Sequence, residues 1–101
     1  MIYYIDIDDT ICTLDVAMDY SSAKPIRKAI DKVNKLYSDG HTINFWTARG
    51  TLSKIKYELL TTYQLSIWGV NYHNLIFGKP NFDVFIDDKN INSRDWLNDG
   101  N

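Results

Sequence analysis

Two aspartate clusters, a threonine and a lysine are the residues of this chain whose types and spacing could do chemistry. The first cluster, Asp6, Asp8 and Asp9, directly follows the apolar residues 2–5 in the stretch MIYYIDIDDT. Side chains alternate along a strand, so Asp6 and Asp8 can point the same way while Asp9 points elsewhere. Crowded carboxylates beside a buried strand repel each other and lose hydration. Taken alone, such a pair belongs to a loop or cap more often than to a catalytic site.

The second acidic cluster, Asp87-Asp88, also follows an apolar run, residues 83–86. If both clusters end strands at one sheet edge, their carboxylates need a cation between them. Oxygen ligands of this kind suit Mg²⁺, which takes one or two carboxylates and leaves positions for water and phosphate. The alternative is a solvated turn, because residues 87–92 are rich in Asp and Asn.

Thr47 and Lys79 complement the acids, since each also follows an apolar run. A hydroxyl followed by free backbone N–H groups at a strand-to-helix turn can hold phosphate oxygens. A lysine at the same edge can neutralise a phosphate as a compact point charge. Judged singly, Thr47 could be only the N-cap of a helix, and Lys79 only a solvated loop residue.

The intervening sequence supplies the elements that would position these residues. Residues 2–5 form a continuous apolar run, which predicts a strand buried on both faces. Pro25 suits the first turn of a helix that ends at a C-capping Gly40. The apolar stripe of this helix is Ile26, Ile30, Val33 and Tyr37.

Further along, the pattern predicts alternating strands and helices. The remaining predicted elements are a loop or small hairpin over residues 10–24, strands at 41–46, 75–77 and 83–86, and a short terminal helix around Trp96 and Leu97. A second helix after Gly50 is predicted to place Leu52, Ile55, Leu59, Leu60 and Tyr63 on one side. This alternation indicates an α/β domain with a mostly parallel sheet, whose ligands bind at the carboxyl ends of the strands.

Composition narrows the classes of protein to consider. The chain has 101 residues, enough for one domain spanning residues 1–101, and 45% of them are hydrophobic and 24% charged. A net charge of −2 gives no general attraction to nucleic acid or acidic membranes. The single cysteine, Cys12, suits a reducing compartment, and no stretch resembles a membrane span or signal peptide. The expected location is the cytoplasm.

Taken together and in this order, the four clusters resemble the motifs of the haloacid dehalogenase-like (HAD) superfamily. The matching residues are Asp6-Ile-Asp8-Asp9-Thr10, Thr47, Lys79 and Asp87-Asp88, and the resemblance covers residues 2 to about 92. Members of this superfamily are mostly Mg²⁺-dependent phosphatases with an aspartate nucleophile. The resemblance therefore implies a three-layer Rossmann-like core and a bound Mg²⁺. Shorter matches at residues 21–25, 47–49, 78–80 and 86–88 look like small phosphatases of capsular polysaccharide biosynthesis, which implies a phosphorylated sugar or glycan precursor as substrate.

Each residue then has an expected role. Asp6 is the predicted nucleophile, because an aspartate with an ordinary pKa of about 3.9 is ionised at neutral pH without a neighbouring base. Asp8 is the predicted general acid and later base, and the resemblance adds its carbonyl as a metal ligand. Asp6 and Asp88 are expected to bind Mg²⁺ directly, and Asp87 directly or through water. Thr47, Ala48, Arg49 and Lys79 are expected to bind the substrate, although Arg49 could equally be a surface arginine.

Residues 7–46 and 48–78 leave no room for a full cap domain over the site. An open site could admit a bulky substrate or polymer end, or a second copy of the chain could cover it. Three functions follow from this pattern. They are a phosphomonoesterase for sugar or glycan phosphates, a phosphatase for polynucleotide ends or phosphoproteins, and a noncatalytic Mg²⁺- or phosphate-binding module.

Overall fold

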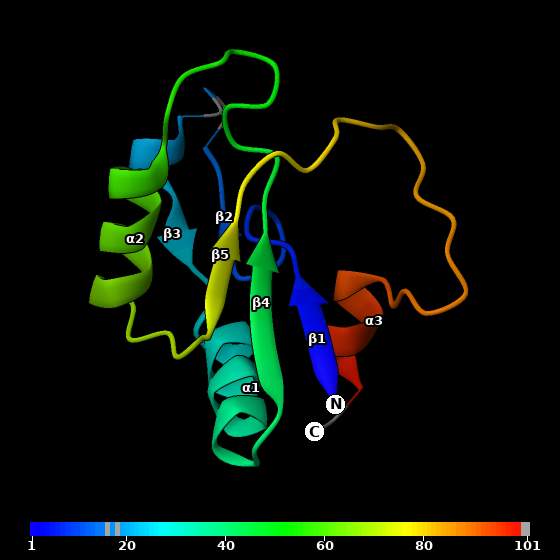
Figure 1. The fold of residues 1–101 in the computed structure, drawn as a ribbon. Coiled ribbons are helices and arrows are strands. Elements are labelled where there is room, and N and C mark those ends of the chain that lie inside the picture. The colour runs from blue at the N-terminus through cyan, green and yellow to red at the C-terminus, as the bar shows by residue number, and fades with distance from the viewer. Residues whose placement is uncertain (16, 18, 100–101) are drawn as a thin grey trace.

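A three-stranded parallel sheet lies at the centre of the fold (Figure 1). In spatial order its strands are β1 (Ile2–Ile5), β4 (Thr42–Trp46) and β5 (Asn74–Ile76). The computed structural model describes residues 1–15, 17 and 19–99. Ile5 pairs with Phe45 and Trp46 pairs with Ile76, so the three strands end at one edge. The predicted α/β class with a small parallel sheet is therefore confirmed.

Helix α1 (Arg27–Ser38) covers one face of this sheet. Its Ala29, Ile30 and Val33 are fully buried, and they share the hydrophobic core with Ile43 and Phe45 of β4. Burial of a side chain as large as Val33 or Ile30 contributes about 1.5–3 kcal/mol. Of the apolar stripe predicted from the sequence, Ile30 and Val33 are buried as expected, whereas Ile26 precedes the helix and Tyr37 is exposed.

The segment before α1 forms a small hairpin, one of the two predicted alternatives. Strand β2 (Cys12–Thr13) pairs antiparallel with β3 (Lys24–Pro25), and a 3₁₀ turn, η1 (Tyr20–Ser22), lies between them. The prediction that Pro25 opens the helix is wrong by two residues. Pro25 pairs with Cys12, and the N–H of Ile26 donates to Ile11 O at 2.8 Å, which holds the chain extended until α1 begins.

Helix α2 (Glu58–Ile67) starts later and buries another side than the sequence predicted. Residues 47–57 form a loop, and Leu59 on the predicted apolar side is 89% exposed. The residues that α2 buries are Thr61, Gln64 and Leu65. The predicted face is wrong because two of these buried residues are polar and bond Arg49, a pattern that hydrophobic periodicity does not detect.

The predicted fourth strand is not formed. Residues 77–92 contain no helix or strand, and they run away from the sheet before helix α3 (Ser93–Asn98) (Figure 1). Val84 is 74% exposed and Ile86 90% exposed, and Phe85 contacts the ring of Phe82 in the same segment, so the run does not pack on the sheet. Strand β1 accordingly stands at the edge of the three-stranded sheet. The terminal helix around Trp96 is confirmed as α3.

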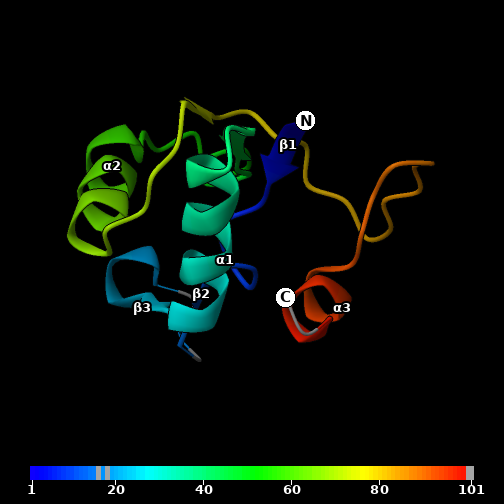
Figure 2. The same cartoon turned by 90° about the horizontal axis from the view of Figure 1, so that it is seen from below.

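Figure 2 shows how the helices are layered around the sheet. Helices α1 and α3 lie side by side on one face, and α2 flanks the sheet on the β5 side. On the opposite face, Ile2 and Tyr4 of β1 are 71% and 62% exposed, so the prediction that this strand is buried on both faces is wrong. The three-layer form of the core is likewise not confirmed. None of the helices in the described ranges is long and apolar enough to cross a membrane.

Candidate active site

Asp6 and Lys79 meet at the carboxyl edge of the sheet. Lys79 Nζ lies 3.5 Å from Asp6 Oδ1, although the two residues are far apart in sequence. The ammonium also lies over the rings of Trp46 and Phe82, at 5.6 and 5.5 Å from their centroids. Burial raises the pKa of Asp6, and the charge of Lys79 acts in the opposite direction. The predicted meeting of the first and third clusters is therefore present.

Backbone hydrogen bonds join the loops that carry Thr47 and Lys79. The N–H of Lys79 donates to Thr47 O at 3.1 Å, and Thr51 Oγ1 donates to Lys79 O at 2.7 Å. Thr47 N donates in turn to Ile76 O at 3.0 Å, which continues the pairing of β4 with β5. The lysine therefore starts from a fixed backbone, although its side chain is long and rotatable.

Thr47 is buried at the end of β4 and does not cap a helix. Its Oγ1 accepts from the N–H of Arg49 at 3.2 Å, and α2 begins only at Glu58. The N-cap alternative considered for Thr47 is thus wrong. Ala48, partly exposed, starts the turn that follows. Phosphate binding by Thr47 and Ala48 stays a prediction.

The Asp8 carboxylate pairs with Arg49, not with the lysine. Arg49 Nη2 lies 2.8 Å from Asp8 Oδ1, and Nε donates to Oδ2 at 3.0 Å, which makes a two-point contact. Asp9 adopts a positive φ of 62° just beyond, and its N–H donates to Cys12 O at 2.8 Å. Each of the two leading aspartates therefore has its own cation, which offsets the repulsion expected between them.

Arg49 itself is enclosed by groups that sequence reasoning missed. Its side chain is 0% exposed, and Nη1 donates to Thr61 Oγ1 at 3.1 Å and to Gln64 Oε1 at 2.6 Å. The guanidinium lies 4.8 Å from the centre of the Tyr20 ring, and Gln64 Nε2 donates to Tyr20 O. The alternative of a surface arginine is wrong. A substrate contact by Arg49 stays a prediction, because four of its hydrogen bonds go to protein groups.

A weak sequence signal for this network exists. Thr61 and Gln64 are three residues apart on α2, so they lie on one side of the helix. Polar residues at such spacing inside a short helix can indicate a buried polar partner, but solvated helices show the same pattern. Only the packing of α2 against the loop after β4 separates the two cases.

Cys12 lies beside Asp8 in the interior. Its thiol is fully buried, and Sγ is 3.5 Å from Asp8 Oδ1. Burial, together with the charge of Asp8, raises the pKa of Cys12 to about 12. The thiol therefore stays protonated at neutral pH and acts as a packed side chain.

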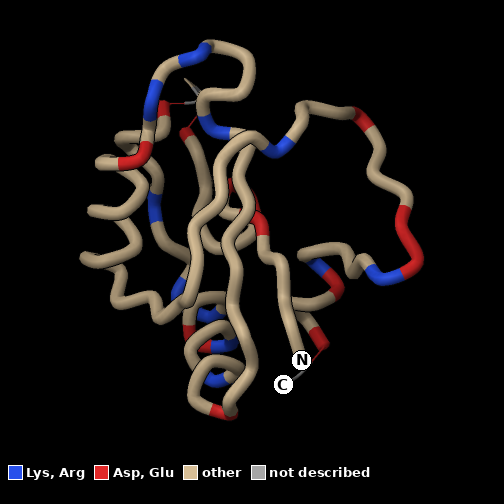
Figure 3. Tube along the Cα trace, viewed as in Figure 1, with Lys and Arg blue, Asp and Glu red and all other residues tan. Residues whose placement is uncertain are grey.

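Asp87 and Asp88 do not join the other clusters in this arrangement. Both are exposed on the segment 77–92, and Asp87 Oδ1 accepts from the N–H of Lys89 at 2.7 Å, as in a solvated turn. Figure 3 shows the acidic residues of this segment away from those at the strand ends. Within the described ranges, no three His, Cys, Asp or Glu side chains are grouped as a metal site. The predicted convergence of both acidic clusters is not observed.

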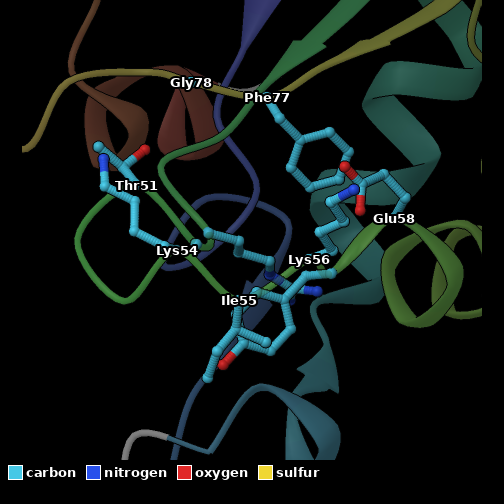
Figure 4. A pocket seen from close by; sticks show the side chains of 10 residues that line it. Thr51, Lys54, Ile55, Lys56, Glu58, Phe77 and Gly78 are labelled. Atoms are coloured by element: carbon cyan, nitrogen blue, oxygen red, sulfur yellow. The ribbon is translucent and has the colours of Figure 1, made fainter.

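An open cavity of about 380 Å³ adjoins the site (Figure 4). The loop after β4 forms one wall, and Phe77 and Gly78 after β5 form another. Thr51 belongs to this lining and also holds the backbone of Lys79, so cavity and lysine share a support.

Comparison with known proteins supports the fold. A crystal structure of a target protein from Vibrio cholerae is similar to this chain, with a TM-score of 0.86 and 21% identity. The similarity covers 96% of this chain and 87% of that chain. No protein-family model and no curated protein matches the sequence. At this level of identity the likeness shows the shared fold and nothing about activity.

Proposed function

We propose that this protein is a Mg²⁺-dependent phosphomonoesterase of the HAD type that forms an aspartyl-phosphate on Asp6. The observation that carries the proposal is the contact of Lys79 Nζ with Asp6 Oδ1 at the sheet edge where Thr47 follows β4. A carboxylate nucleophile, a cation to neutralise phosphate and a threonine with following N–H groups are the parts such a reaction needs. A phosphorylated sugar or glycan precursor is the proposed substrate.

In the proposed reaction Asp6 attacks the phosphorus and the bond to the leaving oxygen breaks. Asp8 gives that oxygen a proton, for which one of its two contacts with Arg49 must open, and later takes a proton from the water that hydrolyses the aspartyl-phosphate. Lys79 offsets the repulsion between the Asp6 carboxylate and the phosphate dianion. Arg49 fixes the direction of Asp8 through its two-point contact.

The oxygens of this chain fit Mg²⁺ in part. The Asp6 carboxylate is partly exposed at the strand end, and it is the kind of ligand that Mg²⁺ prefers. We propose that the Asp8 carbonyl, Asp88 and Asp87, the last directly or through water, complete the set. When bound, the ion would neutralise charge on the phosphate.

For Asp87 and Asp88 to act, the segment before them must lie nearer the site than it does here. Strand β1 is at the edge of the sheet, and the run around Val84 and Ile86 is exposed. Pairing of this run with the outer edge of β1 would bring Asp87 and Asp88 to the carboxyl ends of the strands. We therefore expect Mg²⁺ to slow amide hydrogen exchange in residues 83–88. Exchange unchanged at saturating Mg²⁺ would contradict the assignment of the metal ligands.

Lack of a cap domain and location in the cytoplasm belong to the same proposal. Residues 7–46 hold the hairpin and α1, and residues 48–78 hold a loop, α2 and β5, which supports an open site. A second copy of the chain could cover it. The proposal predicts a phosphatase whose substrate range is set by surfaces near the strand ends.

Phosphate release in the presence of Mg²⁺ tests the function. We expect hydrolysis of an aryl phosphate by the wild type, and a loss greater than about a thousandfold in Asp6→Asn. Asp9→Asn is the matched control, since it removes a neighbouring carboxylate that is not placed in the reaction. Full activity in Asp6→Asn, with the fold checked by circular dichroism, would disprove the nucleophile. A panel of sugar phosphates, phosphorylated oligonucleotide ends and phosphopeptides distinguishes the substrate classes.

A noncatalytic phosphate-binding module is the second candidate. It is favoured by one observation, the two-point pairing of Asp8 with Arg49, which occupies the predicted proton donor. This candidate predicts that phosphate binds, as measured by calorimetry, while the whole panel stays unhydrolysed with Mg²⁺ present. Turnover of any member of the panel excludes it.

A further inference from the structure

The cavity beside Lys79 has a wall whose backbone is held in place. Gly50 has a φ of +83°, and a Cβ at this position would lie 2.2 Å from Ile55 O. Lys54 adopts a φ of +63°, unusual for a residue with a side chain, and its N–H donates to Gly50 O at 2.9 Å. The N–H of Thr51 donates to Ala48 O at 3.0 Å. These contacts join parts of the same loop, so the backbone of its cavity-lining residues is held in a fixed conformation.

The charge of this wall is mainly positive. Lys54 and Lys56 both line the cavity, and neither forms an ion pair in the described part of the chain. Glu58 at the start of α2 is the acidic residue of the lining. Across the cavity, Phe77 supplies an aromatic side chain (Figure 4). Arg49, the third cation of the lining, is paired with Asp8, so the lining combines two further cations with an apolar surface.

We infer that this cavity binds an anionic group on the leaving-group side of the substrate, a carboxylate or a second phosphate. The inference rests on the proposed function, because it takes the reacting phosphate to lie at Asp6 and Lys79. A volume of about 380 Å³ is at the lower end for small-molecule sites and suits a group of about one ring. Lys54 and Lys56 would pair with the anion, and Phe77 would pack against the ring. The substrate class is thus a phosphomonoester that carries another negative charge.

This class has two sources, an acidic or doubly phosphorylated sugar and the phosphorylated end of a nucleic acid. Matched substrate pairs separate them. The pairs are phenyl phosphate with 3-carboxyphenyl phosphate, a hexose 1-phosphate with the 1,6-bisphosphate, and a 3′-phosphorylated nucleoside with the corresponding dinucleotide. We expect kcat/KM to be about tenfold higher for 3-carboxyphenyl phosphate than for phenyl phosphate. A similar preference within the hexose pair identifies the sugar source, and one within the nucleoside pair identifies the nucleic-acid source.

Substitution of the two lysines completes the test. In Lys54→Gln/Lys56→Gln, kcat/KM should fall about tenfold more for 3-carboxyphenyl phosphate than for phenyl phosphate. Lys28→Gln, an exposed lysine on α1 outside the cavity, should leave that ratio as in the wild type. Equal losses on both substrates, or an advantage that survives the double substitution, would overturn the inference while the phosphatase function stands. Absence of hydrolysis by the wild type would overturn both.

Discussion

Around Arg49 the charges are paired and shielded from solvent, whereas the acidic pair at residues 87–88 lies on an exposed segment without helix or strand. Both regions carry residues that the sequence assigns to one site. The Arg49 side chain is 0% exposed and bonds groups from two parts of the chain, Asp8 after β1 and two residues of α2. Ile86, next to the acidic pair, is 90% exposed. The two regions therefore differ in how strongly their surroundings fix them.

Strand pairing explains this difference. Thr47 and Lys79 follow strands that pair with each other, and hydrogen bonds across the ladder continue into the loops behind them. Residues 83–86 pair with no strand, so nothing carries the following aspartates to the same edge. Position after an apolar run is thus sufficient to assemble a site only where that run is part of the sheet.

The largest expected effect comes from breaking the fixed region. Arg49→Met leaves Asp8 without its cation and Gln64 Oε1 without its donor, so the free energy of unfolding should fall by about 3–5 kcal/mol. Urea unfolding followed by circular dichroism measures the change. Arg27→Met is the matched control, since Arg27 Nη1 makes a single hydrogen bond, to Trp68 O, and its loss should cost about 1 kcal/mol. Equal losses in the two variants would contradict the special stability of the Asp8–Arg49 pair.

The loop after β4 should be the next most sensitive. Gly50→Ala places a methyl group against Ile55 O and forces a positive φ, so we expect a loss greater than about 2 kcal/mol. Gly40→Ala has a similar φ of +94° but an open surrounding, and should cost about 1 kcal/mol. Thermal unfolding of both variants isolates the contribution of the close contact. If Gly40→Ala were the more harmful, this loop would not be held by that contact.

A smaller effect is expected from the pH dependence of Asp6 in the metal-free protein. Its folded pKa is raised by burial, so folding disfavours the carboxylate relative to the unfolded chain. Stability should therefore fall as pH rises from the ordinary aspartate pKa of about 3.9 through the raised folded value, and then level off. Asp6→Asn should lack this fall and be the more stable protein at neutral pH. Parallel pH profiles of the urea midpoint in the two proteins would contradict the raised pKa.

The smallest effect is expected in the exposed segment. Ile86→Ser should change the free energy of unfolding by less than about 0.5 kcal/mol without Mg²⁺, because the side chain already contacts solvent. With Mg²⁺ present, the same substitution should weaken metal binding if residues 83–86 dock on β1 in the proposed metal-bound form. Calorimetric titration with Mg²⁺ measures this. A large destabilisation without metal would show that Ile86 is packed.

Sequence patterns predicted the parts of this molecule that local physics dictates. The positions of β1 and β4 and the burial of Ile30 and Val33 follow from apolar runs and helical spacing. The meeting of Asp6 with Lys79 follows from their places after strands of one parallel sheet. The buried side of α2 could not be predicted by hydrophobic periodicity, since Thr61 and Gln64 are buried through their bonds to Arg49. Residues 83–86 have strand propensity, but pairing is a tertiary property that propensity does not determine.

The buried Cys12 makes the interior around Asp8 measurable in solution. As the single cysteine of the chain, with a pKa of about 12, it should be nearly inert to alkylation while the hairpin is closed. The rate at which Cys12 is alkylated then measures how often the hairpin and the Asp8 turn open. A time course of mass spectra during alkylation therefore reports how often the protein exposes the Asp8 carboxylate that Arg49 holds.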